Sequence, residues 1–152
     1  MKYINKKLTI EKVNIQNIAQ KYGTPAYCYS YNKLKENINN FKKNFKSFSP
    51  LICFAIKSNT NLNLIKEIKR FGLGADVVSK GELMIALKAG INPKKIIFSG
   101  VGKTSQEISY AIDKKILLIN AESKSEIKEI DRIAKLKKKT NTNWYQIKSK
   151  YR

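Results

Sequence analysis

From residue 51 onward, short apolar runs alternate with longer amphipathic stretches, and four such pairs follow one another along the chain. Each apolar run has the length of a buried strand, whereas each amphipathic stretch repeats its apolar residues at helical spacing. This alternation is typical of parallel strands that are joined by crossover helices. The predicted strands are residues 51–56, 75–78, 95–98 and 116–120, and each is followed by a predicted helix.

Two α/β folds are built from such units. A (β/α)8 TIM barrel repeats them eight times and typically needs about 250 residues, so the units present here would make half of a barrel. A chain of 152 residues would also allow an open, doubly wound sheet. Periodicity does not distinguish the two architectures, because both contain the same strands and helices.

The segments before and after these units have a different organisation. Residues 15–22 repeat apolar side chains at helical spacing, and a Gly-Thr-Pro sequence ends this leader helix. The aromatic-rich residues 26–31 predict a strand, and residues 32–45 predict a second amphipathic helix. Residues 139–152 show neither the period of a strand nor that of a helix, so we expect a frayed tail.

The formal net charge of +20 raises nucleic-acid binding as a candidate function. The excess is nearly all lysine, since arginine occurs only at positions 70, 132 and 152, and the lysines are scattered over the predicted helices. Lysine without arginine offers little bidentate recognition of bases or phosphates. We therefore expect no specific nucleic-acid partner, and a basic interaction module remains the alternative.

Metal and membrane sites lack their usual sequence signals. Cys28 and Cys53 lie on separate predicted strands without Cys-x-x-Cys spacing, and the sequence contains no histidine. We therefore expect buried free thiols and no metal site. The first residues lack the apolar core of a signal peptide, and no apolar run reaches the length of a membrane span. These features predict a cytoplasmic protein.

Lys57 comes directly after the first predicted strand of the repeat, within Phe54-Ala55-Ile56-Lys57-Ser58-Asn59. A lysine there is unusual, because burying an ammonium group without a partner is costly. Functional residues of a (β/α)8 barrel gather at the carboxyl ends of its strands. A desolvated amine at such a place attacks an aldehyde to form an imine, and the alternative is a side chain that reaches out into solvent.

Asp76 lies in the second predicted strand, where a parallel sheet would bring it close enough to pair with Lys57 or to orient it. The alternative is a carboxylate at the strand edge in contact with water. Ser79 and Glu82 open the following helix, and a serine three residues before a glutamate is typical of a capping box.

The segment Ser99-Gly100-Val101-Gly102-Lys103-Thr104 resembles a phosphate-binding loop. A P-loop follows the pattern Gly-x-x-x-x-Gly-Lys, whereas Val101 alone separates the two glycines here. We therefore predict a tight turn from strand to helix, with Thr104 or Ser105 as the N-cap.

Taken together, several segments resemble the N-terminal part of the fold-type III pyridoxal-phosphate decarboxylases, and most closely the diaminopimelate decarboxylases. Their order and spacing match from about residue 15 to residue 137. The segments are Tyr22-Gly23-Thr24-Pro25-Ala26-Tyr27, Phe54-Ala55-Ile56-Lys57-Ser58-Asn59, Gly72-Leu73-Gly74-Ala75-Asp76-Val77-Val78-Ser79-Lys80-Gly81-Glu82-Leu83, Ala86-Leu87-Lys88-Ala89-Gly90 and Ile97-Phe98-Ser99-Gly100-Val101-Gly102-Lys103-Thr104.

The resemblance implies an alanine racemase-like fold that binds pyridoxal 5'-phosphate in a (β/α)8 barrel. Lys57 falls on the lysine that forms a Schiff base with the cofactor, and Asp76 falls on an acidic cofactor-binding position beside it. The implied reaction is the decarboxylation of meso-2,6-diaminopimelate to L-lysine, in a homodimer. Residues 1–31 would then supply a leader helix and a strand of a second, β-rich domain, and residues 32–138 the first half of the barrel.

The sequence also departs from this family, whose members are much longer. It lacks the histidine that covers the cofactor ring, the glycine-rich loop that holds the phosphate, the acidic partner of the pyridine nitrogen, and the Cys and Tyr of the C-terminal domain. We therefore expect a truncated, inactive fragment whose residues 139–152 are aberrant, as a shift of the reading frame near residues 135–139 would produce. A related decarboxylase of ornithine, arginine or carboxynorspermidine, and a non-catalytic pyridoxal-phosphate-binding module, remain alternatives.

Overall fold

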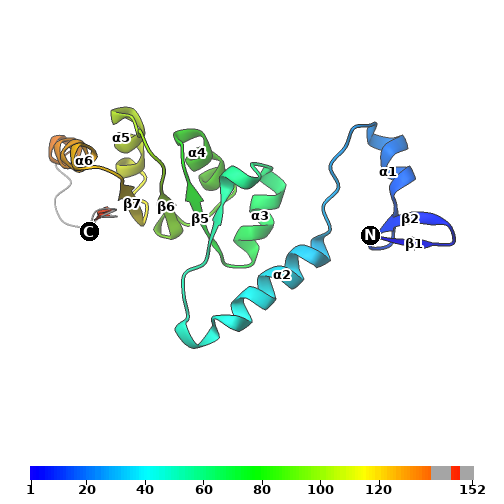
Figure 1. The fold of residues 1–152 in the computed structure, drawn as a ribbon. Coiled ribbons are helices and arrows are strands. Elements are labelled where there is room, and N and C mark those ends of the chain that lie inside the picture. The colour runs from blue at the N-terminus through cyan, green and yellow to red at the C-terminus, as the bar shows by residue number, and fades with distance from the viewer. Residues whose placement is uncertain (138–144, 148–152) are drawn as a thin grey trace. The chain divides into compact units, whose positions relative to one another are not determined.

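The computed structural model describes residues 1–137 and 145–147, and its contacts divide the chain into two compact units. These units are Met1–Pro50 and Leu51–Arg152. The first contains a three-stranded sheet and the second a five-stranded sheet, whose elements can be followed along the chain in Figure 1. The helix after residue 31 belongs by its contacts to the first unit, whereas the sequence analysis grouped it with the barrel.

The first unit opens with a small antiparallel sheet that the sequence analysis did not predict. Its strands are β1 (Lys2–Ile4), β2 (Lys7–Ile10) and β3 (Val13–Asn14), in that order. Asn5 and Lys6 have φ angles of 48° and 61°, as the two central residues of a tight hairpin turn do. These strands lie in a lysine-rich leader that contains no continuous apolar run, which is why they were missed.

Helix α1 (Ile15–Tyr22) confirms the predicted leader helix, and α2 (Tyr31–Asn44) begins one residue before its predicted start. A short 3₁₀ turn, η1 (Lys46–Phe48), follows. Residues 23–30 form neither strand nor helix, so the strand predicted at residues 26–31 is wrong for this chain. Aromatic residues favour strands, but a strand also needs a neighbouring backbone, and no described segment pairs with this one.

The second unit contains a sheet whose strands all run parallel and follow one another in sequence order. They are β4 (Cys53–Ala55), β5 (Gly74–Val77), β6 (Ile96–Phe98), β7 (Leu118–Ala121) and β8 (Tyr145–Ile147). Sequential order is the winding of a (β/α)8 barrel, whereas a doubly wound sheet reverses its order at a switch point. The structure therefore selects the barrel-type architecture that periodicity left open.

Strands β4 to β7 confirm the four predicted strands to within two residues at each end. Strand β8 was not predicted, and it corrects part of the interpretation of residues 139–152 as a frayed or aberrant tail. Its residues pair in parallel with β7. A segment of three residues shows no period of its own, so only this pairing identifies it. The rest of the predicted tail lies outside the described residues.

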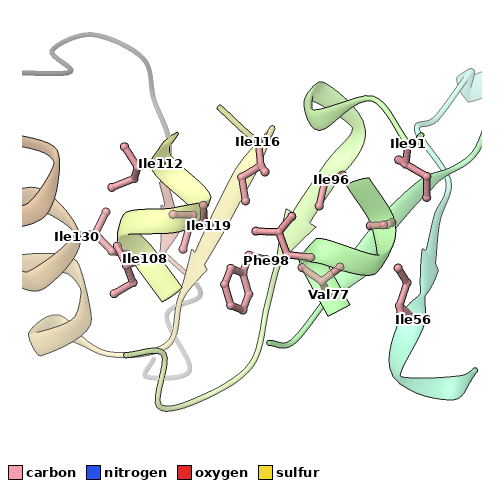
Figure 2. Close-up of a cluster of buried hydrophobic side chains, with 14 of the residues drawn as sticks. Ile56, Val77, Ile91, Ile96, Phe98, Ile108, Ile112, Ile116, Ile119 and Ile130 are labelled. Atoms are coloured by element: carbon pink, nitrogen blue, oxygen red, sulfur yellow. The ribbon is translucent and has the colours of Figure 1, made fainter. Parts of the chain in front are cut away.

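One helix follows each of the first four strands of this sheet. These helices are α3 (Leu62–Arg70), α4 (Lys80–Lys88), α5 (Ser105–Asp113) and α6 (Lys124–Leu136). All four contribute to one hydrophobic cluster, together with alternate residues of the strands. Those strand residues are Ala75, Val77, Ile96, Phe98, Ile119 and Ala121. Figure 2 shows Phe98 and Ile119 beside Ile108 of α5, so the helices cover one face of the sheet.

The remaining strand residues face the opposite side of the sheet. Asp76 pairs with Ala55 on one side and with Ile97 on the other, and Ile97 pairs in turn with Leu118. These four residues are half-buried, whereas the neighbouring residues on the helix side are buried. In the winding of a barrel, the face away from the helices is the interior face.

The close approach of β5 to the segment before β6 leaves no room for a side chain at Gly74. A Cβ atom there would lie 2.1 Å from the main-chain oxygen of Lys95 and 2.8 Å from Cys53 Sγ. Because the nearer contact is backbone, strands must shift to admit a methyl group. We expect Gly74→Ala to lower the free energy of unfolding by about 1–3 kcal/mol, measured by urea denaturation.

Gly81→Ala is the matched control, since the added carbon would meet nothing nearer than Ser79 Oγ at 3.8 Å. Gly81 lies within α4, so alanine should stabilise the helix by about 0.5–1 kcal/mol. Equal denaturation midpoints for the two variants would show that the approach at Gly74 is not tight.

Candidate active site

Lys57 lies in a 3₁₀ turn, η2 (Ile56–Ser58), which follows β4 at the carboxyl edge of the sheet. The turn is held by fully buried Ile56 and by Ser58 Oγ, which donates to the main-chain oxygen of Ala55 over 2.7 Å. The Lys57 side chain itself is exposed and has no hydrogen bond or ion pair within the described part of the chain. The predicted position of Lys57 directly after a strand is confirmed. Its side chain is exposed rather than desolvated, which agrees with the alternative of a lysine that reaches out into solvent.

Asp76 is held by β5 opposite Ala55, which precedes Lys57 by two residues. Its Oδ1 atom is buried and accepts no hydrogen bond from the residues that the structure describes. The structure therefore brings the two predicted site residues to the same edge of the sheet, but it does not join them in an ion pair. A buried acceptor without a donor is costly, so this position favours a partner that brings an N–H or O–H group.

The thiol of Cys53 lies near this carboxylate, two residues before Ala55 on β4. Burial, followed by the negative charge of Asp76, raises the pKa of Cys53. A raised pKa keeps the thiol protonated near neutral pH, and the thiolate is the nucleophilic form. Cys53 is therefore an inert neighbour of the site, and both it and Cys28 are free and half-buried, where the sequence analysis expected buried thiols.

Ser99 and Asn120 form a hydrogen-bonded pair at this edge, and the sequence analysis did not predict it. Asn120 Nδ2 donates to Ser99 Oγ over 2.9 Å. Asn120 is 8% exposed, and its Oδ1 accepts no hydrogen bond from the described residues. The available signal was an asparagine that ends the fourth apolar run, at a place where a buried strand usually carries an aliphatic residue.

The loop between β6 and α5 contains a buried lysine. Lys103 Nζ donates to the main-chain oxygens of Gly100 and Asn120 over 2.6 Å each, and to Glu126 Oε1 over 3.1 Å. These bonds use all the protons of the ammonium group, and the side chain is 1% exposed. Since its charge is already engaged, this loop is not a phosphate-binding loop. The predicted tight turn is confirmed, with Thr104 as the N-cap.

Capping interactions join neighbouring loops at this edge. Thr104 and Glu107 form a capping box at the start of α5. The other carboxylate oxygen of Glu107 accepts a hydrogen bond of 3.0 Å from the main-chain N–H of Lys80, the first residue of α4. The hydrogen bonds from Lys80 and then from Thr104 hold the pKa of Glu107 below its ordinary value. One carboxylate therefore ties two helix starts together.

The capping box expected from Ser79 and Glu82 is only partly formed. Ser79 Oγ accepts from the main-chain N–H of Glu82 over 3.2 Å, as expected. The Glu82 carboxylate, however, accepts from the main-chain N–H of Val78 over 2.9 Å rather than from that of Ser79. Both residues therefore fix the start of α4, and neither reaches the candidate site as a reactive group.

A cleft of about 400 Å³ lies beside the buried lysine, and Lys103, Glu122 and Glu126 are among its lining residues. Neither Lys57 nor Asp76 lines it. Its acidic lining does not suit a phosphate group, because its lysine is already paired. The described residues contain no cluster of side chains that could hold a metal ion. In the same part of the chain, no helix has both the length and the apolar character needed to cross a membrane.

Comparison with known proteins gives a family match over most of the chain. Residues 31–147 match the model for the pyridoxal binding domain of pyridoxal-dependent decarboxylases. A diaminopimelate decarboxylase of Aquifex aeolicus is 45% identical over 140 residues, which are 91% of this chain and 33% of that protein. One from Helicobacter pylori is 47% identical over 121 residues, or 80% of this chain and 30% of that protein. The chain thus spans about a third of the length of these curated relatives.

Solved structures agree with this match. Diaminopimelate decarboxylase from Helicobacter pylori, complexed with L-lysine, superposes with a TM-score of 0.83 at 41% identity, covering 88% of this chain and 34% of that one. The enzyme from M. jannaschii, also in complex with L-lysine, gives a TM-score of 0.89 at 33% identity, covering 94% of this chain and 34% of that one. The resemblance inferred from the sequence motifs is therefore confirmed.

The buried ion pair of Lys103 gives a stability prediction. Lys103→Met would leave the Glu126 carboxylate, which is 9% exposed, without its cation. Removing one partner of a buried pair is strongly destabilising, so we expect a loss of about 3–5 kcal/mol in the free energy of unfolding. Arg70→Met is the control, because Arg70 is 71% exposed in its pair with Glu67 and should cost at most about 1 kcal/mol. Similar losses in urea denaturation would contradict the burial of Lys103.

The lowered pKa of Glu107 gives a pH prediction. A carboxylate of this kind stabilises the fold fully above its ordinary pKa of 4.5, and this contribution is lost as the pH falls through the lower folded value. As the pH falls from about 5 to about 3, the unfolding temperature of Glu107→Gln should therefore drop less than that of the parent. Glu36→Gln, at an exposed pair on α2, should follow the parent curve. Parallel curves for all three proteins would exclude this role for Glu107.

Proposed function

The chain belongs to the family of pyridoxal-dependent decarboxylases, and we propose that it carries the cofactor lysine of a diaminopimelate decarboxylase. In this proposal Lys57 attaches pyridoxal phosphate, and Asp76 is the acidic cofactor-binding residue beside it. The observation that carries the proposal is that the accessible, unpartnered amine of Lys57 and the buried, unpartnered oxygen of Asp76 belong to the same edge of the sheet. Both lie within the segment that matches the pyridoxal binding domain.

The residues present fit the cofactor at the end where it is attached. The amine of Lys57 is not engaged by any described residue, so it is available to the cofactor aldehyde. Asp76 Oδ1 lacks a donor, and a bound group with an N–H or O–H would supply one. The described loops offer no comparable cradle for the phosphate, because Lys103 is fully engaged by its three acceptors.

The mechanism assigns separate tasks to the side chains of this chain. When bound, pyridoxal phosphate supplies the electron sink for the charge that remains on the substrate when carbon dioxide departs. Lys57 tethers the cofactor, and its rigid turn, anchored by buried Ile56, limits where the amine can reach. Asp76 Oδ1 would accept a hydrogen bond from an N–H or O–H group of the bound cofactor. The apolar side chains of Ile97 and Leu118, on the same face of the sheet, restrict water beneath the site.

Meso-2,6-diaminopimelate is the proposed substrate and L-lysine the proposed product. Curated bacterial relatives of this name, among them those of Aquifex aeolicus, Helicobacter pylori and Haemophilus influenzae, share 40–47% identity with the chain. A decarboxylase of ornithine is a second candidate, since an ornithine decarboxylase from Entamoeba histolytica superposes with a TM-score of 0.56 at 28% identity. The higher identity of the diaminopimelate enzymes favours meso-2,6-diaminopimelate as the substrate.

The proposal extends to the whole enzyme, of which this chain spans about a third. The unit that begins at Leu51 then supplies the first half of the cofactor-binding barrel, and residues 1–31 are assigned to a second, β-rich domain. From the family resemblance we further propose that the whole enzyme is a homodimer and acts in the cytoplasm.

Covalent attachment of the cofactor at Lys57 is the direct test. Incubation with pyridoxal phosphate should give the visible absorbance of a lysine-bound cofactor, and borohydride reduction should fix the label on the Lys57 peptide. Peptide mapping by mass spectrometry is essential, because the many exposed lysines also react weakly. We expect Lys57→Ala to lose the absorbance, because Lys57 is the lysine proposed to attach the cofactor.

Lys66→Ala is the matched control, because Lys66 is an exposed lysine on the neighbouring helix α3. The Lys66→Ala variant should carry the reduced cofactor label on Lys57, as the parent protein does. Asp76→Asn should retain the label but weaken cofactor binding by about tenfold, as expected for the loss of a charge-assisted hydrogen bond. Labels spread evenly over many lysines, or unchanged in Lys57→Ala, would refute the assignment of Lys57.

A further inference from the structure

The amide of Asn120 is the most deeply buried polar side-chain group on the site face of the sheet whose hydrogen-bonding capacity is unfilled in the described chain. Its Nδ2 is fixed by Ser99 Oγ at 2.9 Å, and its main-chain oxygen is fixed by Lys103 Nζ at 2.6 Å. Its Oδ1 is buried and has no donor. Asn120 is thus held through its side-chain nitrogen and its main-chain oxygen, while its side-chain oxygen is unsatisfied. A buried acceptor without a donor lowers stability, so folding alone does not explain its presence.

Strand register places Asn120 on the same face as the proposed cofactor residues. On β7 the residues Ile119 and Ala121 enter the hydrophobic cluster beneath the helices, so Asn120 between them faces the opposite side. Asp76 faces that side too, because Ala75 and Val77 are in the same cluster. Asn120 is thus separated from Asp76 by one strand, β6.

The chemistry available on this face is complementary to a donor. The two unfilled buried atoms, Asp76 Oδ1 and Asn120 Oδ1, are both acceptors. The nearest buried cation, Lys103, has no proton left to offer, since all three are engaged. A ligand that satisfies Asn120 must therefore bring its own N–H or O–H, and a charged ammonium group forms a stronger hydrogen bond to an amide oxygen than a neutral donor does.

We propose that Asn120 is a further ligand-binding residue, whose Oδ1 accepts a hydrogen bond from an ammonium group of an amino-acid ligand. The inference rests on the proposed function in one respect, because that function makes the ligand an amino acid. Ser99 orients the amide so that its oxygen, rather than its nitrogen, faces the ligand. Lys103 holds the backbone beneath it and is a positioning residue.

The test uses the full chain without cofactor and L-lysine as the probe, titrated calorimetrically. Asn120→Val removes the acceptor and should weaken L-lysine binding by about tenfold or more, the loss expected for a hydrogen bond to a charged group. The same variant should raise the unfolding temperature, because the unsatisfied acceptor is gone. Asn120→Asp keeps an acceptor and adds a negative charge, so it should bind L-lysine at least as tightly as the parent.

Leu117→Ile is the control, because Leu117 is exposed and lies directly before β7, at the amino end of the strand and away from the carboxyl edge. It should leave L-lysine affinity unchanged. Nα-acetyl-L-lysine and Nε-acetyl-L-lysine each lack one ammonium group, and the inference requires that at least one of them binds more weakly than L-lysine. The form that loses affinity identifies the amine that Asn120 contacts, and Asn120→Val should abolish the difference between the two.

Several results would overturn the inference: no L-lysine binding by the parent, unchanged affinity in Asn120→Val, or weaker binding in Asn120→Asp, which would place the amide nitrogen towards the ligand. Because these titrations contain no pyridoxal phosphate, they are independent of labelling at Lys57. Specific labelling without an effect of Asn120 would remove this inference and leave the proposed function intact. Weaker L-lysine binding in Asn120→Val without specific labelling at Lys57 would support this inference and remove the proposed role of Lys57.

Discussion

The parallel pairing of successive strands is the constraint on which the rest of this structure depends. Because β4 to β8 pair in sequence order, every connection must cross back along the same face of the sheet, and the helices collect there. The same pairing places all carboxyl ends at one edge. Lys57, Asp76, Ser99 and Asn120 come from four different strands or strand ends, and they meet at that edge for this reason alone.

Polar interactions join the loops at this edge. Lys103 joins its own loop to the end of β7 and to α6, while Glu107 joins the starts of α4 and α5. Each of these groups satisfies main-chain atoms that helix starts and strand ends would otherwise leave without partners. The loops are therefore tied to one another, while Lys57 remains exposed. An accessible amine beside well-held loops suits the proposed role of Lys57 in covalent attachment of a cofactor.

Much of this fold follows from local pattern. Four strands and the helices between them were predicted because each strand buries one face and each helix one stripe, and both leave a period in the sequence. The failures have a common cause. The strand expected at residues 26–31 has the right aromatic residues but no described partner, whereas the unpredicted strands β1, β2, β3 and β8 exist through pairing despite having at most four residues each. Pairing is a tertiary interaction, so propensity misjudged both cases.

The sequence by itself determined the family and the position of Lys57 after a strand. It also indicated that Asp76 matches the acidic position that lies beside the cofactor lysine in the family. All three depend on motifs in linear order. Only the tertiary structure decided between a barrel-type and a doubly wound sheet, because strand order is absent from periodicity. It also revealed that Lys103 is buried and paired, that Glu82 closes on Val78, and that Asn120 carries an unfilled acceptor on the site face. Burial and hydrogen-bond satisfaction depend on what surrounds a side chain, and segments distant in the sequence supply those surroundings.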